Sequence, residues 1–475
     1  MRHNGVRTVG RGRTKSQAVE CGSATSELLG RRRGRQKKRV AVGALLAGSA
    51  LLFSACGSTA PSSSAEAASR ATASSKQKSV DLGYFFWTST PEGVKVWTHD
   101  YEQVEKLYPY IHIHLTTTTW TDYWEKLPLE AATGSMPCLA GLQYGYVGSV
   151  GKDFIPLNSL IKKYHYSLKP FEPTMIRELS VNSKLIALPY DFGPIVIAYN
   201  KNLFKAKGVA DPKDGWTWAE FLSDAKKLTG KGDYGFMFDG ISESLVTDLT
   251  GVEDAFLVNG KFDLTNAAFE RGVQLQAELH YKYHVTPAYS TAPNYATDAW
   301  DTGKMGMTIA GPWDLDTYKE LTSIQTGWVE LPRAPGRSAE TSFNEGSGFG
   351  ITKDCPASEI PDAFKALTGL VDSNGLSYAA SVGRAYPARL ADDPIWSRYA
   401  GEGAGPVMAA ALKLAKPEEV TTNWTAFETA TDKYDTLVLN GTISAAKYAH
   451  DVQADAGPGS GVSPGSDASL LGSGS

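Results

Sequence analysis

The chain of 475 residues carries 47 lysines and arginines against 51 aspartates and glutamates. Residues 1–55 hold 12 of the basic and 2 of the acidic residues, which leaves 35 and 49 in the remainder, a net charge of −14. So acidic a remainder excludes a nucleic-acid partner, because phosphate backbones are bound by clustered lysine and arginine. Residues 80–455 are numerous enough for two domains.

The first feature along the chain is a basic run at 31–39 followed by sixteen small or apolar residues, 40–55, and then Cys56. This order is typical of a secretory signal peptide, and sixteen residues fall short of the about 20 that span a bilayer. We therefore predict a bacterial lipoprotein: residues 1–55 are the signal peptide, and Cys56 is the acylated first residue that anchors the exported protein to the cell membrane. The alternative is an ordinary buried cysteine after an apolar segment.

Two segments of small residues flank the predicted globular part. Residues 57–78 are rich in Ser, Ala and Thr and contain no large apolar side chain, so they cannot offset their ordering entropy by burial. We predict a lipidated flexible tether at 56–79. The segment 456–475 is rich in Gly, Ser and Pro, and we predict a disordered tail there.

The globular part opens with an alternation of predicted strands and helices. The aromatic run 80–87 predicts a buried strand, 91–108 has helical spacing up to Pro109, and 111–115 alternates with the period of a strand. A helix at 120–132 and a strand at 138–142 follow.

This order predicts parallel strands with right-handed crossovers, and ligands bind beyond the carboxyl ends of such strands. The candidate binding residues that follow the three strands are Trp87, Ser89, Trp120, Tyr123, Gln143 and Tyr144.

Later segments carry a resemblance to a known family. The segment 188–204 reads LPYDFGPIVIAYNKNLF, 208–221 contains WTWAEF, 303–315 reads GKMGMTIAGPWDL, and 345–353 reads EGSGFGITK. These blocks, with RAYPA at 384–388, resemble in order and spacing the extracellular solute-binding proteins of ABC importers, in particular the maltose-binding-protein-like family that captures sugars. Cys138 departs from the pattern, because a Met-Pro-Asp-like sequence is usual there.

The resemblance implies an α/β, two-lobed periplasmic-binding-protein-like (type II) fold with a hinge and an interlobe ligand cleft. Lobe one would comprise 80–190 plus 335–380, and lobe two 191–334 plus 381–455. The implied protein is a monomer that binds a sugar, an oligosaccharide in particular, and delivers it to the permease subunits of an ABC transporter. It would use no cofactor and no metal, and it would not be an enzyme.

Further candidate site residues come from these later segments. A sugar offers a flat C–H face, which suits aromatic rings, and a rim of hydroxyl groups, which suits carboxylates, amides and arginine. The additional candidates are Asp191, Asp239, Trp313, Ser347 and Arg384. Trp313 is the strongest of them, with a core position as its alternative, and Asp191 has the alternative of capping a local turn.

Other functions stay open at this point. A secreted polysaccharide-active enzyme, a glycosidase or lyase, would also need an aromatic cleft, and a binding protein of this fold can take a polyamine, a peptide or glycerol phosphate. The sequence contains no motif that supplies a nucleophile, a metal site or a cofactor loop, because the G-x-S-x-G match at 461–465 lies in the predicted tail. It does not decide whether Cys138 and Cys355 form a disulfide.

Overall fold

The computed structural model describes residues 78–88, 91–252, 255–292, 295–336, 342–417 and 420–462. The predicted signal peptide, the lipidated Cys56, most of the predicted tether and the candidate Ser89 lie outside these residues. Among the helices within these ranges, none is both long and apolar enough to cross a membrane.

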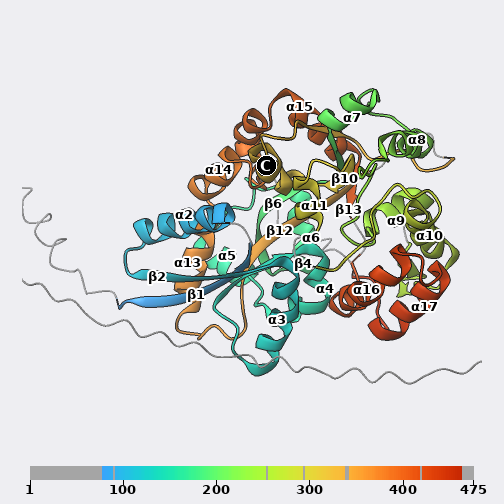
Figure 1. Ribbon diagram of the computed structural model, residues 1–475. Coiled ribbons are helices and arrows are strands. Elements are labelled where there is room, and N and C mark those ends of the chain that lie inside the picture. The colour runs from blue at the N-terminus through green and yellow to red at the C-terminus, as the bar shows by residue number, and fades with distance from the viewer. Residues whose placement is uncertain are drawn as a thin grey trace, which may run out of the picture. The chain divides into compact units, whose positions relative to one another are not determined.

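The larger sheet is built on the three parallel strands that the sequence predicts (Figure 1). β1 (Val80–Trp87) pairs with β2 (Ile111–Thr118) on one side and with β3 (Leu139–Gln143) on the other. β3 is buried along its whole length, which explains its apolar sequence. The sheet continues through β12 (Ser342–Ile351) to β13 (Ala415–Pro417), so the strand order is β13-β12-β3-β1-β2.

Two helices connect these strands. α2 (Pro91–Leu107) joins β1 to β2, and α3 (Trp120–Thr133) joins β2 to β3. The Thr119 side chain accepts a hydrogen bond from the Asp122 amide and so caps the start of α3, while Gly134 ends the helix in the left-handed conformation at φ 66°. Because α3 begins directly after β2, its first turn lies at the carboxyl edge of the sheet.

Two long antiparallel strands carry the chain between the lobes. β6 (Ala187–Pro194) pairs with β12 (Ser342–Ile351), and β12 also pairs with β3 of the larger sheet. After β6 the chain enters β7 (Val196–Asn200), the central strand of a second sheet between β10 (Met307–Ala310) and β11 (Thr326–Val329). The fold is therefore α/β with two lobes joined at crossing strands, as predicted.

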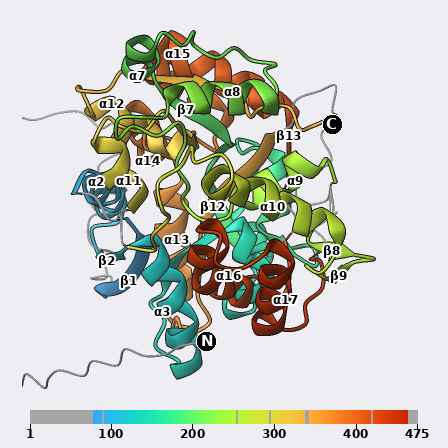
Figure 2. The same ribbon diagram turned by 45° about the vertical axis from the view of Figure 1, so that its right-hand side comes forward.

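Helices cover both sheets. α13 (Ile360–Leu370) and α14 (Ser373–Ser381) pack beside α2 (Figure 2). In the second lobe, a group of helices packs together: α9 (Glu243–Thr250), α10 (Ala267–Tyr281), α16 (Trp424–Leu439) and α17 (Ala445–Ala456). The remaining elements are α4 (Val147–Val150), α5 (Asn158–Tyr164), α6 (Pro173–Glu178), β4 (Ser180–Val181), β5 (Lys184–Leu185), α7 (Lys201–Lys207), α8 (Trp218–Leu228), α9 (Glu243–Thr250), β8 (Leu257–Val258), β9 (Lys261–Phe262), α10 (Ala267–Tyr281), α11 (Tyr295–Asp301), α12 (Leu315–Glu320), α13 (Ile360–Leu370), α14 (Ser373–Ser381), α15 (Asp393–Leu414), β13 (Ala415–Pro417), α16 (Trp424–Leu439) and α17 (Ala445–Ala456), with short three-ten turns η1 (Tyr144–Tyr146), η2 (Gly151–Asp153), η3 (Pro312–Asp314) and η4 (Leu390–Asp392).

The prediction of disorder from residue 456 needs correction for the residues up to 462. The Phe262 amide donates to the Gly459 carbonyl at 3.0 Å, and the Val462 amide donates to the Val420 carbonyl at 2.8 Å. A Cβ on Gly459 would lie 1.9 Å from Asn423 Oδ1, so this segment packs closely because it has no side chain there. Composition did not reveal this order, because backbone hydrogen bonds need no apolar side chains.

Cys138 and Cys355 form a disulfide, the point that the sequence left open. It joins the approach to β3 to the chain just after β12, across 217 residues of sequence. The carboxylate of Glu359 lies close to both sulfur atoms. Because the disulfide uses both thiols, these three residues do not provide the thiolates of a metal site.

Candidate functional site

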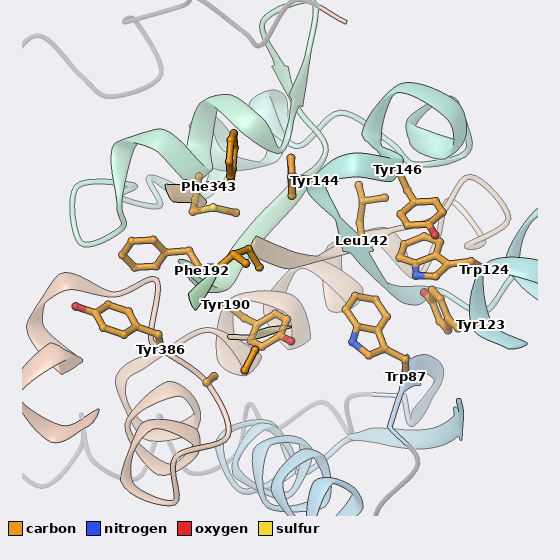
Figure 3. Close-up of a cluster of buried hydrophobic side chains, with 14 of the residues drawn as sticks. Trp87, Tyr123, Trp124, Leu142, Tyr144, Tyr146, Tyr190, Phe192, Phe343 and Tyr386 are labelled. Carbon is orange, nitrogen blue, oxygen red and sulfur yellow. The ribbon is translucent and has the colours of Figure 1, made fainter. Parts of the chain in front are cut away.

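An aromatic cluster lies at the carboxyl edge of the larger sheet (Figure 3). The Trp124 ring lies flat on the Tyr146 ring with centroids 3.5 Å apart. Trp120 packs edge-on against Trp124 at 5.4 Å and against Trp87 at 5.2 Å. Trp87 is nearly covered, but Trp120 keeps 42% of its surface exposed. The cluster therefore presents an aromatic face outside the sheet.

Helix α16 of the second lobe lies opposite this aromatic face. Trp120, Trp124 and Tyr146 line one side of a cavity of about 60 Å³, together with Thr121 and Glu125. The other lining residues all belong to α16: Thr425, Glu428, Thr429 and Asp432. The cavity thus has aromatic rings on one side and hydroxyl and carboxylate groups on the other.

Carboxylates gather around the α16 side of this cavity. Burial raises the pKa of Asp432, and the negative charges of Glu125 and Asp239 raise it further. The Asp239 side chain is exposed to solvent, yet burial also raises its pKa. The carboxyl groups of Glu125, Asp239 and Asp432 therefore lie near enough to one another to interact electrostatically.

The loop that carries Asp239 is fixed to α16 by Asp435. One oxygen of the buried Asp435 accepts a hydrogen bond from the Ile241 amide at 2.8 Å, and the other accepts from the Tyr448 hydroxyl at 2.7 Å. Gly240 has a φ of 101°, a conformation that disfavours other residues. Asp435 is thus a positioning residue for the Asp239 loop.

Asp435 makes the stability of the protein depend on pH. Burial raises its pKa from 3.8 to about 7, so between these values the folded protein holds a proton that the unfolded chain releases. The resulting stabilisation is full below pH ~4 and is lost as the pH rises through ~7.

We expect Asp435→Asn to gain stability relative to the parent protein as the pH rises from 5 to 8, by about 2–3 kcal/mol, because about two of the three pKa units of the shift fall within this interval. The amide oxygen can still accept from Ile241. Urea unfolding at both pH values measures this, and a stability difference that stays the same at pH 5 and pH 8 would contradict it.

A second group of side chains lies on the crossing strands. Asp191 on β6 pairs with Ser347 on β12, and both are buried. Burial raises the pKa of Asp191 to about 6, although hydrogen bonds from Tyr190 and Ser347 and the charge of Arg384 oppose the rise. The sequence-predicted residues Asp191, Ser347 and Arg384 therefore lie together.

Trp313 joins this group through its backbone. Arg384 Nη1 donates to the Trp313 carbonyl at 3.2 Å. The turn before Trp313 packs on the crossing strands, because a Cβ on Gly193 of β6 would lie 2.2 Å from Pro312 Cγ. The Trp313 ring lies against Gly311, where a Cβ would be 2.3 Å from it, and the side chain is half-buried.

Asp314 connects the two groups electrostatically. Its pKa is raised to about 7, mainly by burial and also by the charges of Asp316 and Asp239, while the hydrogen bond from the Gly311 amide and the charge of Arg384 oppose the rise. Its Oδ2 atom accepts from the Gly311 amide at 2.9 Å. Asp239 thus influences both Asp314 and Asp432, so the aromatic cavity and the Asp191 group lie along one acidic region.

Three other predicted site residues have side chains that are buried or hydrogen-bonded inside the protein. The buried Tyr123 donates its hydroxyl proton to the Gly141 carbonyl at 2.7 Å. The Gln143 side chain accepts from the Gly145 amide at 2.7 Å, and Tyr144 is buried. These side chains support the edge of the sheet and leave little surface for a ligand.

Several residues of the site were missing from the sequence-based prediction. Trp124 and Glu125 follow Trp120 on α3, and the spacing of four between the tryptophans places them on one face of the helix. That spacing was a usable signal. No signal in the sequence identified Glu428 and Asp432, because only the folding of the chain brings α16 to the carboxyl edge of the larger sheet.

The fold and this site define a two-lobed α/β binding protein whose lobes meet at an aromatic and acidic region. The chain belongs to the bacterial extracellular solute-binding protein family, whose family model matches residues 87–370.

Relatives and solved structures agree with this membership. The maltodextrin-binding protein MdxE of Bacillus subtilis is 23% identical over 285 residues, 55% of this chain and 61% of that protein. A galactooligosaccharide-binding protein of the same species is 24% identical over 231 residues, 46% of this chain. The chain thus matches little more than half the length of these curated relatives, 61% and 53%.

Among solved structures, the fold is similar to that of the ABC substrate-binding protein Lmo0181 from Listeria monocytogenes in complex with cycloalternan. The TM-score is 0.73 at 18% identity, and the match covers 80% of this chain and 98% of that one. It is also similar to the MalE domain of Bdellovibrio bacteriovorus bound to maltotriose, with a TM-score of 0.68 at 18% identity over 79% and 98% of the two chains. These similarities establish the two-lobed fold.

Proposed function

We propose that this protein captures an oligosaccharide between its two lobes and delivers it to an ABC importer. The observation that carries the proposal is the aromatic face of Trp120, Trp124 and Tyr146 opposite the polar face of α16. Its relatives include a maltodextrin-binding and a galactooligosaccharide-binding protein, which supports the same class of ligand.

The chemistry of the site suits a sugar. Aromatic rings cover the C–H face of a pyranose at a low cost in side-chain entropy, since they have few rotatable bonds. Carboxylates accept hydrogen bonds from the hydroxyl groups at the rim of the sugar, and arginine donates hydrogen bonds to them. Trp120 would supply the first function, and Asp239, Asp432 and Arg384 the second.

Ligand entry requires the lobes to separate. The cavity of about 60 Å³ is far below the about 300–1,000 Å³ of typical ligand pockets. Because α3 belongs to one lobe and α16 to the other, a hinge motion at β6 and β12 would widen it. We propose lobe one as 80–190 plus 335–380 and lobe two as 191–334 plus 381–455.

We further propose that the protein works outside the cell membrane as a monomeric lipoprotein. The disulfide between Cys138 and Cys355 supports export, because such bonds persist in oxidising compartments. Cys56→Ala is expected to move the protein from the membrane fraction to the medium, measured by fractionation and immunoblotting. Continued membrane association of this variant would argue against lipid attachment at Cys56.

One incubation experiment distinguishes a binding protein from an enzyme. The proposal predicts that maltotriose or a related oligosaccharide binds in calorimetry and is recovered intact after long incubation with the purified protein. Shortened or unsaturated products on chromatography would instead establish a glycosidase or a lyase, the alternative left open by the sequence.

A further inference from the structure

A second cavity lies on the face of the crossing strands β6 and β12 that is opposite to the side chains of Asp191 and Ser347. Its volume is about 320 Å³. It is lined by Glu172, Thr174, Phe192, Asn344, Tyr386, Pro387, Leu390, Asp393, Leu412, Lys413 and Ala415. The proposed sugar site uses none of these residues.

Strand geometry places this cavity behind the hinge. Ser347 pairs with Asp191, and Asn344 lies three residues before Ser347 on β12, so their side chains point to opposite faces. Phe192 follows Asp191 on β6 and likewise points away from it. Figure 3 shows Phe192 and Tyr386 apart from Trp87 and Trp124, with Tyr190 between them.

The interior of the cavity offers a hydrogen-bond acceptor that the described residues leave unused. Asn344 is only 5% exposed, and its Oδ1 atom is buried without a hydrogen-bond partner among them. Its Nδ2 atom has a weak contact of 3.8 Å with Met175 Sδ. An unpaired buried acceptor destabilises the fold, and a ligand that donates a hydrogen bond would remove that cost.

Two carboxylates line the same cavity as this acceptor. Asp393 Oδ1 accepts from the Tyr386 hydroxyl at 2.6 Å, and Glu172 Oε1 accepts from the Thr174 amide at 3.2 Å. Burial raises the pKa of Tyr386, the hydrogen bond and charge of Asp393 raise it further, and so does the charge of Glu172. Both carboxylates are therefore close to the same ring, and each has a second oxygen outside these hydrogen bonds.

The other residues that line the cavity indicate the kind of ligand. Phe192, Leu390 and Leu412 form an apolar wall. Of the described lining residues, Lys413 alone carries a positive charge, and its side chain is exposed at the rim. Three acceptor groups beside an apolar wall match a donor-rich cation on an apolar body.

We propose that this cavity is a second small-molecule site, selective for a primary ammonium group carried on a short apolar body. The ammonium group would donate to Asn344, Asp393 and Glu172. A free amine and an amino acid share this chemistry, and Lys413 distinguishes them, since it can pair with the carboxylate of an amino acid.

Calorimetry on the purified protein with 2-phenylethylamine, phenylalanine and 2-phenylethanol tests this. We expect the amine to bind and the alcohol, which has no charge, to bind at least tenfold more weakly. If phenylalanine binds more tightly than 2-phenylethylamine, and this difference is lost in Lys413→Gln, the cavity is an amino-acid site. If phenylalanine binds equally well or more weakly, the cavity is an amine site. No binding of either ammonium compound at 10 mM would overturn the proposal.

Amino-acid substitutions test whether the amine binds in this cavity. Asp393→Asn, which can still accept from Tyr386, should weaken amine binding at least tenfold. Leu390→Trp should block the cavity without removing a polar group, and it should fold normally because Leu390 is 50% exposed. Asp432→Asn, in the proposed sugar site, is the matched control and should leave amine binding unchanged. Loss of amine binding in Asp432→Asn but not in Asp393→Asn would overturn the proposal in favour of the front cavity.

Discussion

Replacing Trp120 with alanine is expected to weaken oligosaccharide binding at least fivefold, which corresponds to more than about 1 kcal/mol. Trp120 keeps 42% of its surface exposed and lines the cavity opposite α16, so its ring is free to stack on a sugar. Its removal also exposes the edge of the stacked Trp124 and Tyr146 pair. Calorimetric titration of the parent protein and the variant with the same oligosaccharide measures the effect.

The same helix provides a matched control for this substitution. Leu129 is 66% exposed on α3 and does not line the cavity, so Leu129→Ala removes an exposed apolar side chain away from the proposed site. We expect Leu129→Ala to leave the dissociation constant unchanged. Equal affinity of the Trp120→Ala variant and the parent protein would remove the aromatic face from the ligand site.

Loss of the disulfide is expected to lower the free energy of unfolding by about 2–5 kcal/mol. The bond closes a long loop, with 217 residues separating Cys138 from Cys355, and both cysteines are buried beside the larger sheet. Constraint of the unfolded chain is the main source of this stabilisation, and it grows with the length of the loop. Urea unfolding of the parent protein and of the double variant Cys138→Ser, Cys355→Ser measures it.

A reducing agent provides the control for the disulfide. Dithiothreitol should lower the urea midpoint of the parent protein towards that of the double variant, and it should leave the double variant unchanged. The sugar affinity of the folded variant should be close to that of the parent, because the disulfide lies outside both cavities. A urea midpoint of the parent that does not respond to reduction would contradict the disulfide.

The sequence predicted the first lobe well because its signals are local. The strand at 80–87 and the order of strands and helices around it follow from apolar periodicity and capping, and the structure has the same elements. The predicted strand at 111–115 extends to Thr118. The added residues Thr116 to Thr118 bury little apolar surface, so periodicity alone did not include them.

The site was predicted only in part, for a physical reason. Trp87 is the last residue of one strand and Trp120 comes shortly after another, so topology places them at the sheet edge from sequence alone. Asp432 lies on a helix more than 300 residues further along the chain, and no local pattern relates the two. Tyr123 shows the opposite error, because its position in the sequence matched the site while its hydroxyl is used by Gly141.

The central claim is that the protein binds a sugar, and a thermal-shift screen tests it most directly. The purified protein would be heated with mono- and oligosaccharides, polyamines and peptides. A ligand at ~100 times its dissociation constant stabilises the folded state by ~2.7 kcal/mol, which raises the melting temperature measurably. We expect the melting temperature to rise with one series of oligosaccharides, and we expect this rise to be lost in Trp120→Ala. No response to any sugar, together with a response to polyamines or peptides, would contradict it and leave the fold with a different ligand.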